Sequence, residues 1–243
     1  MEKISFERLF KQEKPIMGMI HLAGNGRAEK VKRALEELAI YGEEEVDGAI
    51  IEDYHGSVDD VQEVLKQSQG RFDGVVRGVN DLRNPCLGFK FAQDYGAKFV
   101  QFDSVHMSGL DLDVYNSMRI KFPNIVVLGG VGFKYIRPTG NSLELDLEEG
   151  KSRCEAIVTT GSGTGVETPI DKLKQYKELL EEFPLIVGAG VDLENVYDQL
   201  KIVDGVIIGS YFKLGGDTHR PIERQRVRDL MNLVGVVRGF WSE

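Results

Sequence analysis

Eight short aliphatic runs alternate with helical patterns along the whole 243-residue chain. Each run is nearly continuous in apolar residues, as expected of parallel strands that are buried on both faces. Successive runs begin 20 to 32 residues apart, which leaves room for one helix in every interval. The runs occupy residues 15–21, 47–53, 73–79, 98–103, 124–130, 155–160, 184–190 and 204–209.

The intervals carry helix-start signals, in which a capping side chain precedes a proline or an acidic residue. These signals are Ser57 with Asp60, Asn84 with Pro85, and Thr168 with Pro169. Eight such strand–helix units predict an α/β fold, a single (β/α)8 TIM barrel with a short N-terminal helix, in one domain over residues 1–243. An open doubly wound sheet is the competing fold, but no G-x-G-x-x-G follows the first run.

Composition excludes several classes of protein. The net charge of −9 and the pI near 5.1 argue against nucleic acid as a partner, because duplex binding depends on Lys and Arg neutralising phosphates. Cys86 and Cys154 lie far apart without metal-ligand spacing, so we expect reduced core thiols. No apolar run approaches about 20 residues, and residues 1–15 lack the apolar centre of a signal peptide. We therefore expect a cytoplasmic protein without membrane insertion.

Glycines and a hydroxyl end the last two runs, where TIM barrels often bind phosphate. Gly188 and Gly190 close the seventh run, and Gly209 and Ser210 close the eighth. Glycine lets backbone N–H groups approach an anion closely. We interpret these four residues as a phosphate cradle; the alternative is that the glycines serve only turn geometry.

Polar or titratable residues end or follow each of the first five runs, at the same predicted rim. As catalytic candidates we take His21, Glu52, Asp103 and Lys134, because a carboxylate and a histidine facing one carbon can serve as base and acid. Glu52 and Asp53 are adjacent, so one should face the barrel mouth and the other should cap the next turn.

Further polar residues near the rim are substrate or phosphate candidates. Asn80 and Arg83 follow the third run, and Ser162 and Thr164 lie in the "GSGTG" stretch after the sixth. A divalent metal is an option rather than a requirement, with His21, Glu52, Asp103 and His106 as candidate ligands. No HxH or HExxH spacing occurs, and the sequence requires no cofactor. His55, His106 and His219 fall in loops, where a solvated role is the simpler reading.

Several stretches resemble the BtpA/SgcQ family over almost the whole chain. The resemblance is carried by "IMGMIHLAG", "VDGAIIEDY", "RGVNDLRNPCLGFKFAQDYGAKFVQFD" and "TTGSGTG", and by the Gly-Ser…Lys pattern of "IIGSYFK". The family's proline-rich loop after the first His-Leu is shortened here to "AGNG", and its Glu-Asn pair stands as Glu52–Asp53. The resemblance implies a phosphoribosyl-binding type of barrel, and "VGAGVDLENV" is similar to the phosphate strand of phosphoribosylanthranilate isomerases.

Together these features favour an enzyme that acts on a phosphorylated sugar or nucleotide-like small molecule. The reaction would be acid/base isomerisation, or cleavage of a C–N or C–C bond by a lyase or nucleosidase-like activity. Two alternatives stay open: an assembly or membrane-complex biogenesis factor, as the family resemblance implies for photosystem I, and a sensor that binds a sugar phosphate without turnover. Related barrels often pair, so a homo-oligomer is also an expectation.

Overall fold

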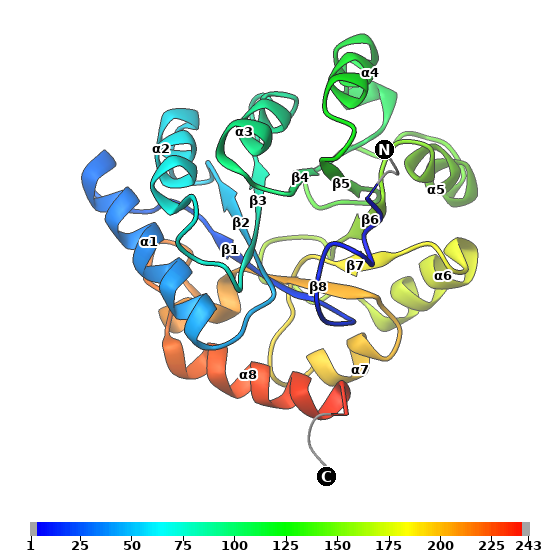
Figure 1. Cartoon of the computed structure of the whole chain (residues 1–243). Helices are drawn as coiled ribbons and strands as arrows, with labels where there is room; N and C mark the ends of the chain where they lie inside the picture. The colour runs from blue at the N-terminus through cyan, green and yellow to red at the C-terminus, as the bar shows by residue number, and fades with distance from the viewer. Residues whose placement is uncertain (1–3, 240–243) are drawn as a thin grey trace.

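Eight parallel strands close into a barrel in sequence order in the computed structural model, which describes residues 4–239 (Figure 1). Strand β1 pairs with β2 on one side and with β8 on the other. The barrel predicted from the eight aliphatic runs is therefore confirmed. The strands are β1 Ile16–Ile20, β2 Gly48–Glu52, β3 Val76–Asn80, β4 Phe99–Phe102, β5 Val126–Gly130, β6 Ala156–Thr159, β7 Leu185–Val187 and β8 Gly205–Ile208.

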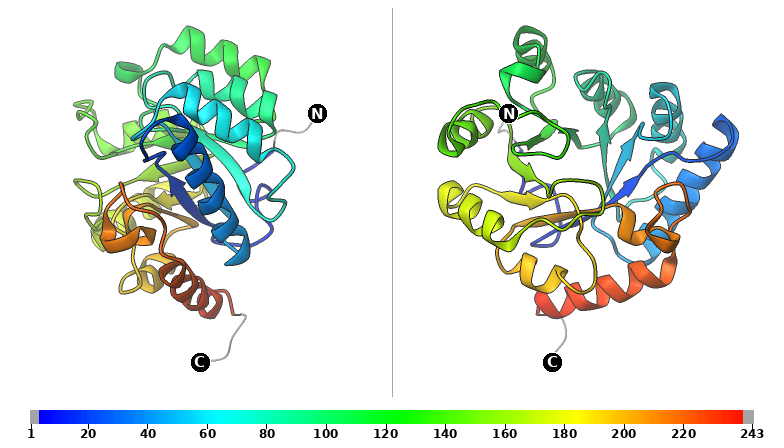
Figure 2. Two further views of the ribbon diagram at one scale, coloured as in Figure 1. Left: turned by 90° about the vertical axis from the view of Figure 1, so that its left-hand side faces the viewer. Right: turned by 180° about the vertical axis from the view of Figure 1, so that it is seen from behind.

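The α-helices form a ring outside the strands, as the views in Figure 2 show. They are α1 Arg27–Glu43, α2 Val58–Ser68, α3 Leu87–Tyr95, α4 Leu112–Lys121, α5 Leu143–Lys151, α6 Ile170–Leu180, α7 Val196–Leu200 and α8 Arg224–Val237. Short 3₁₀ helices follow β4 at Met107–Gly109 and β8 at Ser210–Phe212 and Leu214–Gly216. Most helices bury one apolar face against the strands, which is the amphipathic pattern of the sequence.

Strand side chains alternate between the barrel interior and the helix layer. In β1, Met17 and Met19 belong to an interior cluster that contains no helix residue, whereas Ile16 and Ile20 pack with residues of the helices. In β2, Ile50 points inward in the same way. Because the side-chain period of a strand is two, the residues two positions beyond these interior residues also face inward, at the carboxyl end of the barrel.

The opposite, amino end of the barrel is closed by the chain that precedes β1. The N-terminal helix predicted from the sequence is wrong for the described residues 4–14, which form turns and bends. Phe6 and Phe10 of this segment are buried among the interior residues, and the Phe10 ring lies 6.1 Å from the Phe99 ring. A helix would place successive apolar side chains along one stripe, whereas here the chain crosses the barrel opening (Figure 1).

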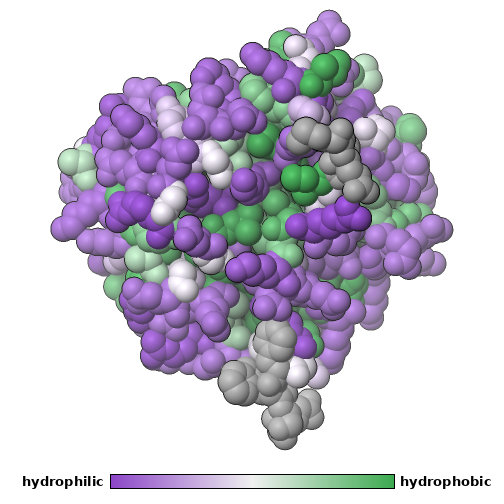
Figure 3. All heavy atoms as spheres, in the orientation of Figure 1, coloured by the Kyte–Doolittle hydropathy of each residue, from purple (hydrophilic) through white to green (hydrophobic). Residues whose placement is uncertain are grey.

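The surface of this amino-terminal side is mainly hydrophilic around its rim, and hydrophobic side chains show at the centre of the view (Figure 3). Among the described residues, no helix is both long enough and apolar enough to cross a membrane.

Candidate active site at the carboxyl end of the barrel

Inward-facing polar side chains from neighbouring strands meet at the carboxyl end of the barrel. Glu52 lies two residues beyond Ile50, and it is buried with 6% of its surface exposed. The Asn80 side-chain amide donates hydrogen bonds to Glu52 Oε1 at 2.8 Å and to Asp103 Oδ1 at 3.1 Å. Gln101 donates to the same Asp103 oxygen at 3.3 Å. The Asn80 amide thus links the two carboxyl groups, and the Gln101 amide adds a second contact to Asp103.

The electrostatics of this group favour a protonated Glu52. Burial raises the pKa of Glu52 to about 8, and the nearby Asp103 carboxylate adds to that shift. Burial also raises the pKa of Asp103, against the hydrogen bond from Asn80. The Lys134 ammonium opposes both shifts, so it lies within electrostatic reach of both carboxyl groups. A carboxyl group with a pKa near the working pH can exchange a proton with a substrate in either direction.

His21 stands beside Glu52 as a neutral imidazole. Its Nε2 lies 4.0 Å from Glu52 Oε2, which is beyond hydrogen-bond distance. Burial lowers the pKa of His21 well below its ordinary value, and Lys213, His55 and Lys134 lower it further. Neutral imidazole is a poor general acid at neutral pH, but it can still donate one hydrogen bond and accept another.

Unused hydrogen-bonding capacity surrounds the two carboxyl groups. Three buried atoms have no partner among the described residues: His21 Nδ1, Asn80 Oδ1 and Gln101 Oε1. Buried polar atoms are nearly always hydrogen-bonded, so three orphaned atoms in one place are a feature of a binding site. A cavity of about 150 Å³ lies beside them and is also lined by Lys134 and by the predicted cradle residues Gly188 and Gly209.

Gly209 has a clear steric role in this cavity. A Cβ atom at Gly209 would lie 3.2 Å from the nearest ring atom of His21, so a side chain there would crowd the imidazole. Glycine at the end of β8 therefore leaves room for His21.

Asp53 faces the opposite way from Glu52 and organises the loop after β3. Its carboxylate accepts a hydrogen bond from the Leu82 backbone N–H at 2.8 Å and pairs with the Arg83 guanidinium at 2.6 Å. The alternation of the strand thus makes Glu52 the member of the pair that faces the mouth. Arg83, predicted to bind substrate or phosphate, is largely exposed and engaged with Asp53, outside the cavity. Asn80, predicted for the same role, is hydrogen-bonded to the Glu52 and Asp103 carboxyl groups.

The loops after β6, β7 and β8 line a second cavity of about 400 Å³. Gly190 and Ser210 of the predicted cradle lie here with Thr164 and with Arg226 from α8, whose guanidinium also pairs with Glu223 at 2.8 Å. Gly190 has a φ of 66°, and a Cβ atom there would lie 2.2 Å from the Glu167 backbone nitrogen. Close packing of the loops after β6 and β7 therefore requires glycine at this position whether or not an anion binds.

The chain itself already uses some of the donors in this second cavity. The Asp192 carboxylate accepts hydrogen bonds from the backbone N–H groups of Glu194 and Asn195, at 2.9 and 3.2 Å, so these donors are used within the turn that precedes α7. Asp217 also lines the cavity. An anion in this cavity would consequently depend on Arg226 and on the amides around Gly190 and Ser210, rather than on the end of α7.

Two tyrosines that the sequence analysis missed reach over the barrel mouth. The Thr164 backbone N–H donates to the Tyr135 hydroxyl at 3.0 Å, and the Tyr54 hydroxyl lies 3.5 Å from Thr164 Oγ1. Tyr135 is 71% exposed and has a φ of 63°, a left-handed conformation that costs energy in a residue other than glycine. Both tyrosines and Thr164 line the cavity of about 150 Å³ beside Glu52, which we call the central cavity, so they form part of its wall.

The remaining candidates lie elsewhere. Ser162 is exposed and lines a cavity beside α6, away from Gly190 and Ser210. His106 is buried against α5 and does not join His21, Glu52 and Asp103 in a metal-ligand group. His55 and His219 stack on each other with ring centroids 3.7 Å apart, and His55 is half-buried.

We also did not predict Gln101 and Arg226 as site residues from the sequence. Gln101 lies in β4, and Asp103 follows the strand two residues later. The side-chain period of two could therefore have identified Gln101 as a second inward-facing residue. Arg226 belongs to the basic "ERQRVR" stretch of residues 223–228, and only the packing of α8 brings it to the cavity.

Comparison with known proteins agrees with this architecture. The sequence profile of the BtpA family matches residues 12–235. The chain belongs to the BtpA family. An uncharacterized protein of Pyrococcus abyssi is 27% identical to this BtpA family member, over 93% of the chain and 98% of that protein. The photosystem I biogenesis protein BtpA of Synechocystis sp. is 23% identical, over 90% of the chain and 87% of that protein.

Solved structures share the fold at low sequence identity. N-(5'-phosphoribosyl)anthranilate isomerase from Pyrococcus furiosus matches with a TM-score of 0.61 and 13% identity, over 92% of this chain and 99% of that one. Orotidine 5'-phosphate decarboxylase from Pyrococcus horikoshii matches with a TM-score of 0.62 and 12% identity, over 90% and 98% of the two chains. This BtpA family member therefore has a fold that also serves an isomerase and a decarboxylase.

Proposed function

We propose that this BtpA family member is an enzyme that acts on a phosphorylated sugar or nucleotide-like compound bound across the barrel mouth. The observation that carries the proposal is that Glu52, Asp103 and Lys134 line one cavity at the carboxyl end of the strands, with Asn80 linking the two carboxyl groups by hydrogen bonds. Active sites of TIM-barrel enzymes lie at this end. A buried carboxyl group whose pKa is raised to about 8 favours an enzyme over a sensor or a scaffold.

The two cavities are neighbours, because Thr164 and Gly165 of the loop after β6 line both. A ligand that spans them can place its phosphate near Arg226 and Ser210 while its sugar carbons reach Glu52. Fixing one end of the ligand in this way positions the other end for reaction. The isomerase and decarboxylase of the same fold are named for phosphate-bearing compounds, which is consistent with this arrangement.

In this proposal the ionised form of Glu52 acts as the general base; a pKa of about 8 makes this the minor form at neutral pH, but a stronger base than an ordinary carboxylate. It removes a proton from a carbon or hydroxyl of the ligand and returns it to a neighbouring atom, or to a leaving group when a C–N or C–C bond breaks. The Lys134 ammonium stabilises the negative charge that develops on the ligand. His21 stays neutral and donates or accepts one hydrogen bond. None of these steps requires a redox cofactor.

A thermal-shift screen tests the proposal. It compares phosphorylated sugars and nucleotides with their unphosphorylated counterparts, because a ligand that binds only the folded chain raises its apparent melting temperature. We expect stabilisation by a phosphorylated compound and turnover of that compound. Equal stabilisation by the unphosphorylated counterparts contradicts the phosphate cavity, and stabilisation without turnover favours the sensor.

A further inference from the structure

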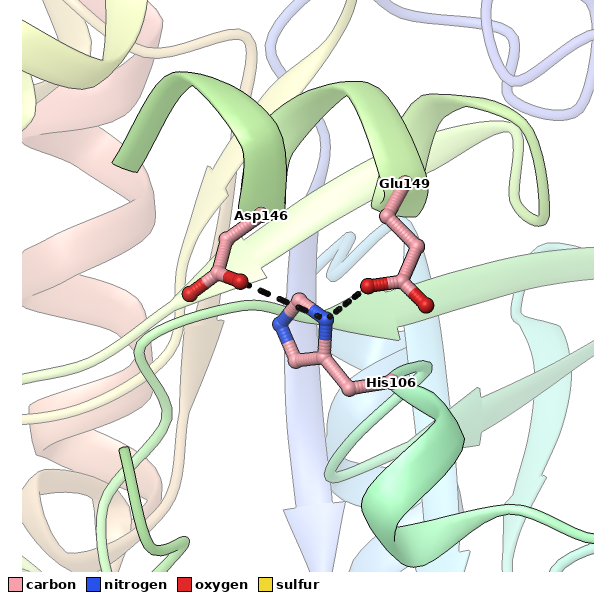
Figure 4. A group of neighbouring side chains, drawn as sticks. All are labelled: His106, Asp146 and Glu149. Atoms are coloured by element: carbon pink, nitrogen blue, oxygen red, sulfur yellow. Dashed lines mark hydrogen bonds and ion pairs between the residues drawn. The ribbon is translucent and has the colours of Figure 1, made fainter. Parts of the chain in front are cut away.

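His106 lies in a second cluster of titratable groups, outside the barrel mouth. It follows β4, only 4% of it is exposed, and its ring is turned towards α5. Figure 4 shows the imidazole pointing between two carboxylates from successive turns of that helix. His106 Nδ1 lies 3.2 Å from Glu149 Oε2 and 3.9 Å from Asp146 Oδ1. One ligand atom from each residue lies within 4.8 Å of the others, and no other group of the described residues gathers three such donors.

These separations suit three ligands of one metal ion. Divalent ions bind imidazole nitrogen and carboxylate oxygen at about 2.0–2.2 Å, so two ligand atoms of one ion lie about 3 to 4 Å apart. The Asp146 oxygen is too far from Nδ1 for a hydrogen bond but fits that range. His106 Nε2 has no partner among the described residues, so protein contacts use only one of the two ring nitrogens.

The charges of the cluster also suit a cation. Asp146 and Glu149 are three residues apart on one helix, where like charges repel each other. Glu149 Oε1 pairs with Arg153 at 2.6 Å, which leaves Oε2 directed at His106. Asp146 accepts hydrogen bonds from the neutral Thr139 hydroxyl and Asn141 amide. Such contacts orient the carboxylates of a metal site, as outer hydrogen bonds commonly do.

We propose that His106, Asp146 and Glu149 bind a divalent transition-metal ion of the Zn²⁺ class. One imidazole with two carboxylates is a mixed nitrogen and oxygen set, which suits such ions better than Mg²⁺ or Ca²⁺. Three protein ligands would leave coordination positions open to other ligands, and His106 and Asp146 line a cavity of about 520 Å³ together with Ser162 and Lys172. This cavity shares no lining residue with the phosphate cavity.

Calorimetric titration of the chelator-treated, dialysed full chain with Zn²⁺ tests this site without any phosphorylated compound. We expect one ion per chain, and at least about tenfold weaker binding after Glu149→Gln or Asp146→Asn. Glu144→Gln is the matched control, because Glu144 is an exposed glutamate on the same helix. His219→Ala is a second control, because it removes an exposed histidine that stacks on His55 and is not part of the proposed metal site.

Cobalt provides a second readout, because Co²⁺ held by nitrogen and oxygen ligands has a visible absorption band that responds to its ligands. The band should appear with the unchanged chain and both controls, and should be lost with His106→Gln. If His106→Gln does not fold, Glu149→Gln decides the question, since Glu149 is half-buried. Absence of Zn²⁺ binding, or equal affinity in Glu149→Gln and Glu144→Gln, overturns the proposal and leaves the phosphate proposal untouched.

Discussion

The two halves of the barrel mouth are built from different parts of the chain. On the side of β2 to β4, side chains make the site: Glu52, Asn80 and Asp103 are hydrogen-bonded at the ends of their strands. On the side of β6 to β8, backbone makes it, and Gly190 and Ser210 line a cavity between loops. Side chains on rigid strands tune proton affinity, whereas glycine-rich loops provide donors and space for an anion. In the proposed function this division separates chemistry from binding.

The largest expected effect comes from Glu52→Gln. Loss of the general base should lower turnover of a compound found by the screen by at least about 100-fold, while its binding is kept. Glu194→Gln, at an exposed glutamate after β7, is the control. The measurement is turnover beside calorimetric affinity. Unchanged turnover would show that Glu52 is not the general base. Loss of binding would show that Glu52 also holds the ligand, so that chemistry and binding are not divided between the two halves of the barrel mouth.

Ser210→Glu tests the other half. A carboxylate in the cavity lined by Ser210 and Arg226 should repel phosphate and abolish phosphate-dependent stabilisation, with at least about tenfold weaker binding. Ser162→Glu makes the same change of charge at an exposed serine outside that cavity, so it should leave binding nearly intact. Thermal-shift measurements of both variants would contradict the assignment if the two lost stabilisation equally.

Lys134→Met should change the pH dependence of turnover. The Lys134 ammonium lowers the pKa of Glu52, so its removal should raise that pKa, and the base should become active at higher pH. We expect the midpoint of kcat/KM to move upward by roughly one unit. A profile of kcat/KM against pH measures this shift. A midpoint that stays in place would mean that Lys134 does not act on Glu52.

Stability should depend on pH through the same carboxyl group. The pKa of Glu52 is about 8 in the folded chain, against roughly 4.3 in an unfolded one. Between these values the folded chain holds a proton that the unfolded chain has released. This contribution is therefore complete below about pH 4.3 and is lost as pH rises through 8, at up to about 1.4 kcal/mol per unit. Urea denaturation from pH 5 to 8.5 should show a shallower decline in Glu52→Gln, and parallel curves would contradict this.

The smallest expected effect belongs to Arg83→Ala. Because Arg83 is engaged with Asp53 outside the central cavity, its loss should change affinity for a phosphorylated compound by less than about threefold. Calorimetric affinity measures it. A loss of tenfold or more would place Arg83 in the binding site, as the sequence alone had suggested.

Strand periodicity explains how much of the site could be predicted. The aliphatic runs predicted the barrel. Residues at the ends of parallel strands lie at the same end of a barrel, which is why His21 and Glu52 could be predicted to lie close together. The choice between Glu52 and Asp53 required the inward phase of β2, which Ile50 sets. The capping box of Ser57 with Asp60 formed as predicted, whereas Thr168 donates to the Ala189 carbonyl instead of capping α6.

Contacts between loops were beyond local sequence patterns. The left-handed Tyr135, whose hydroxyl accepts from Thr164, depends on tertiary packing between the loops after β5 and β6. The approach of Arg226 to Ser210 depends on where α8 lies against the barrel. The pairing of His106 with Glu149 likewise joins a loop to a helix 43 residues away.

The most direct test of the account is the titration of the Glu52 carboxyl group itself. Carbon-13 NMR of the chain labelled at glutamate side-chain carboxyls, compared with Glu52→Gln, identifies its resonance and follows it with pH. We expect a midpoint near 8. A midpoint near the ordinary glutamate value of about 4.3 would show a solvated carboxylate and would contradict the proposed base.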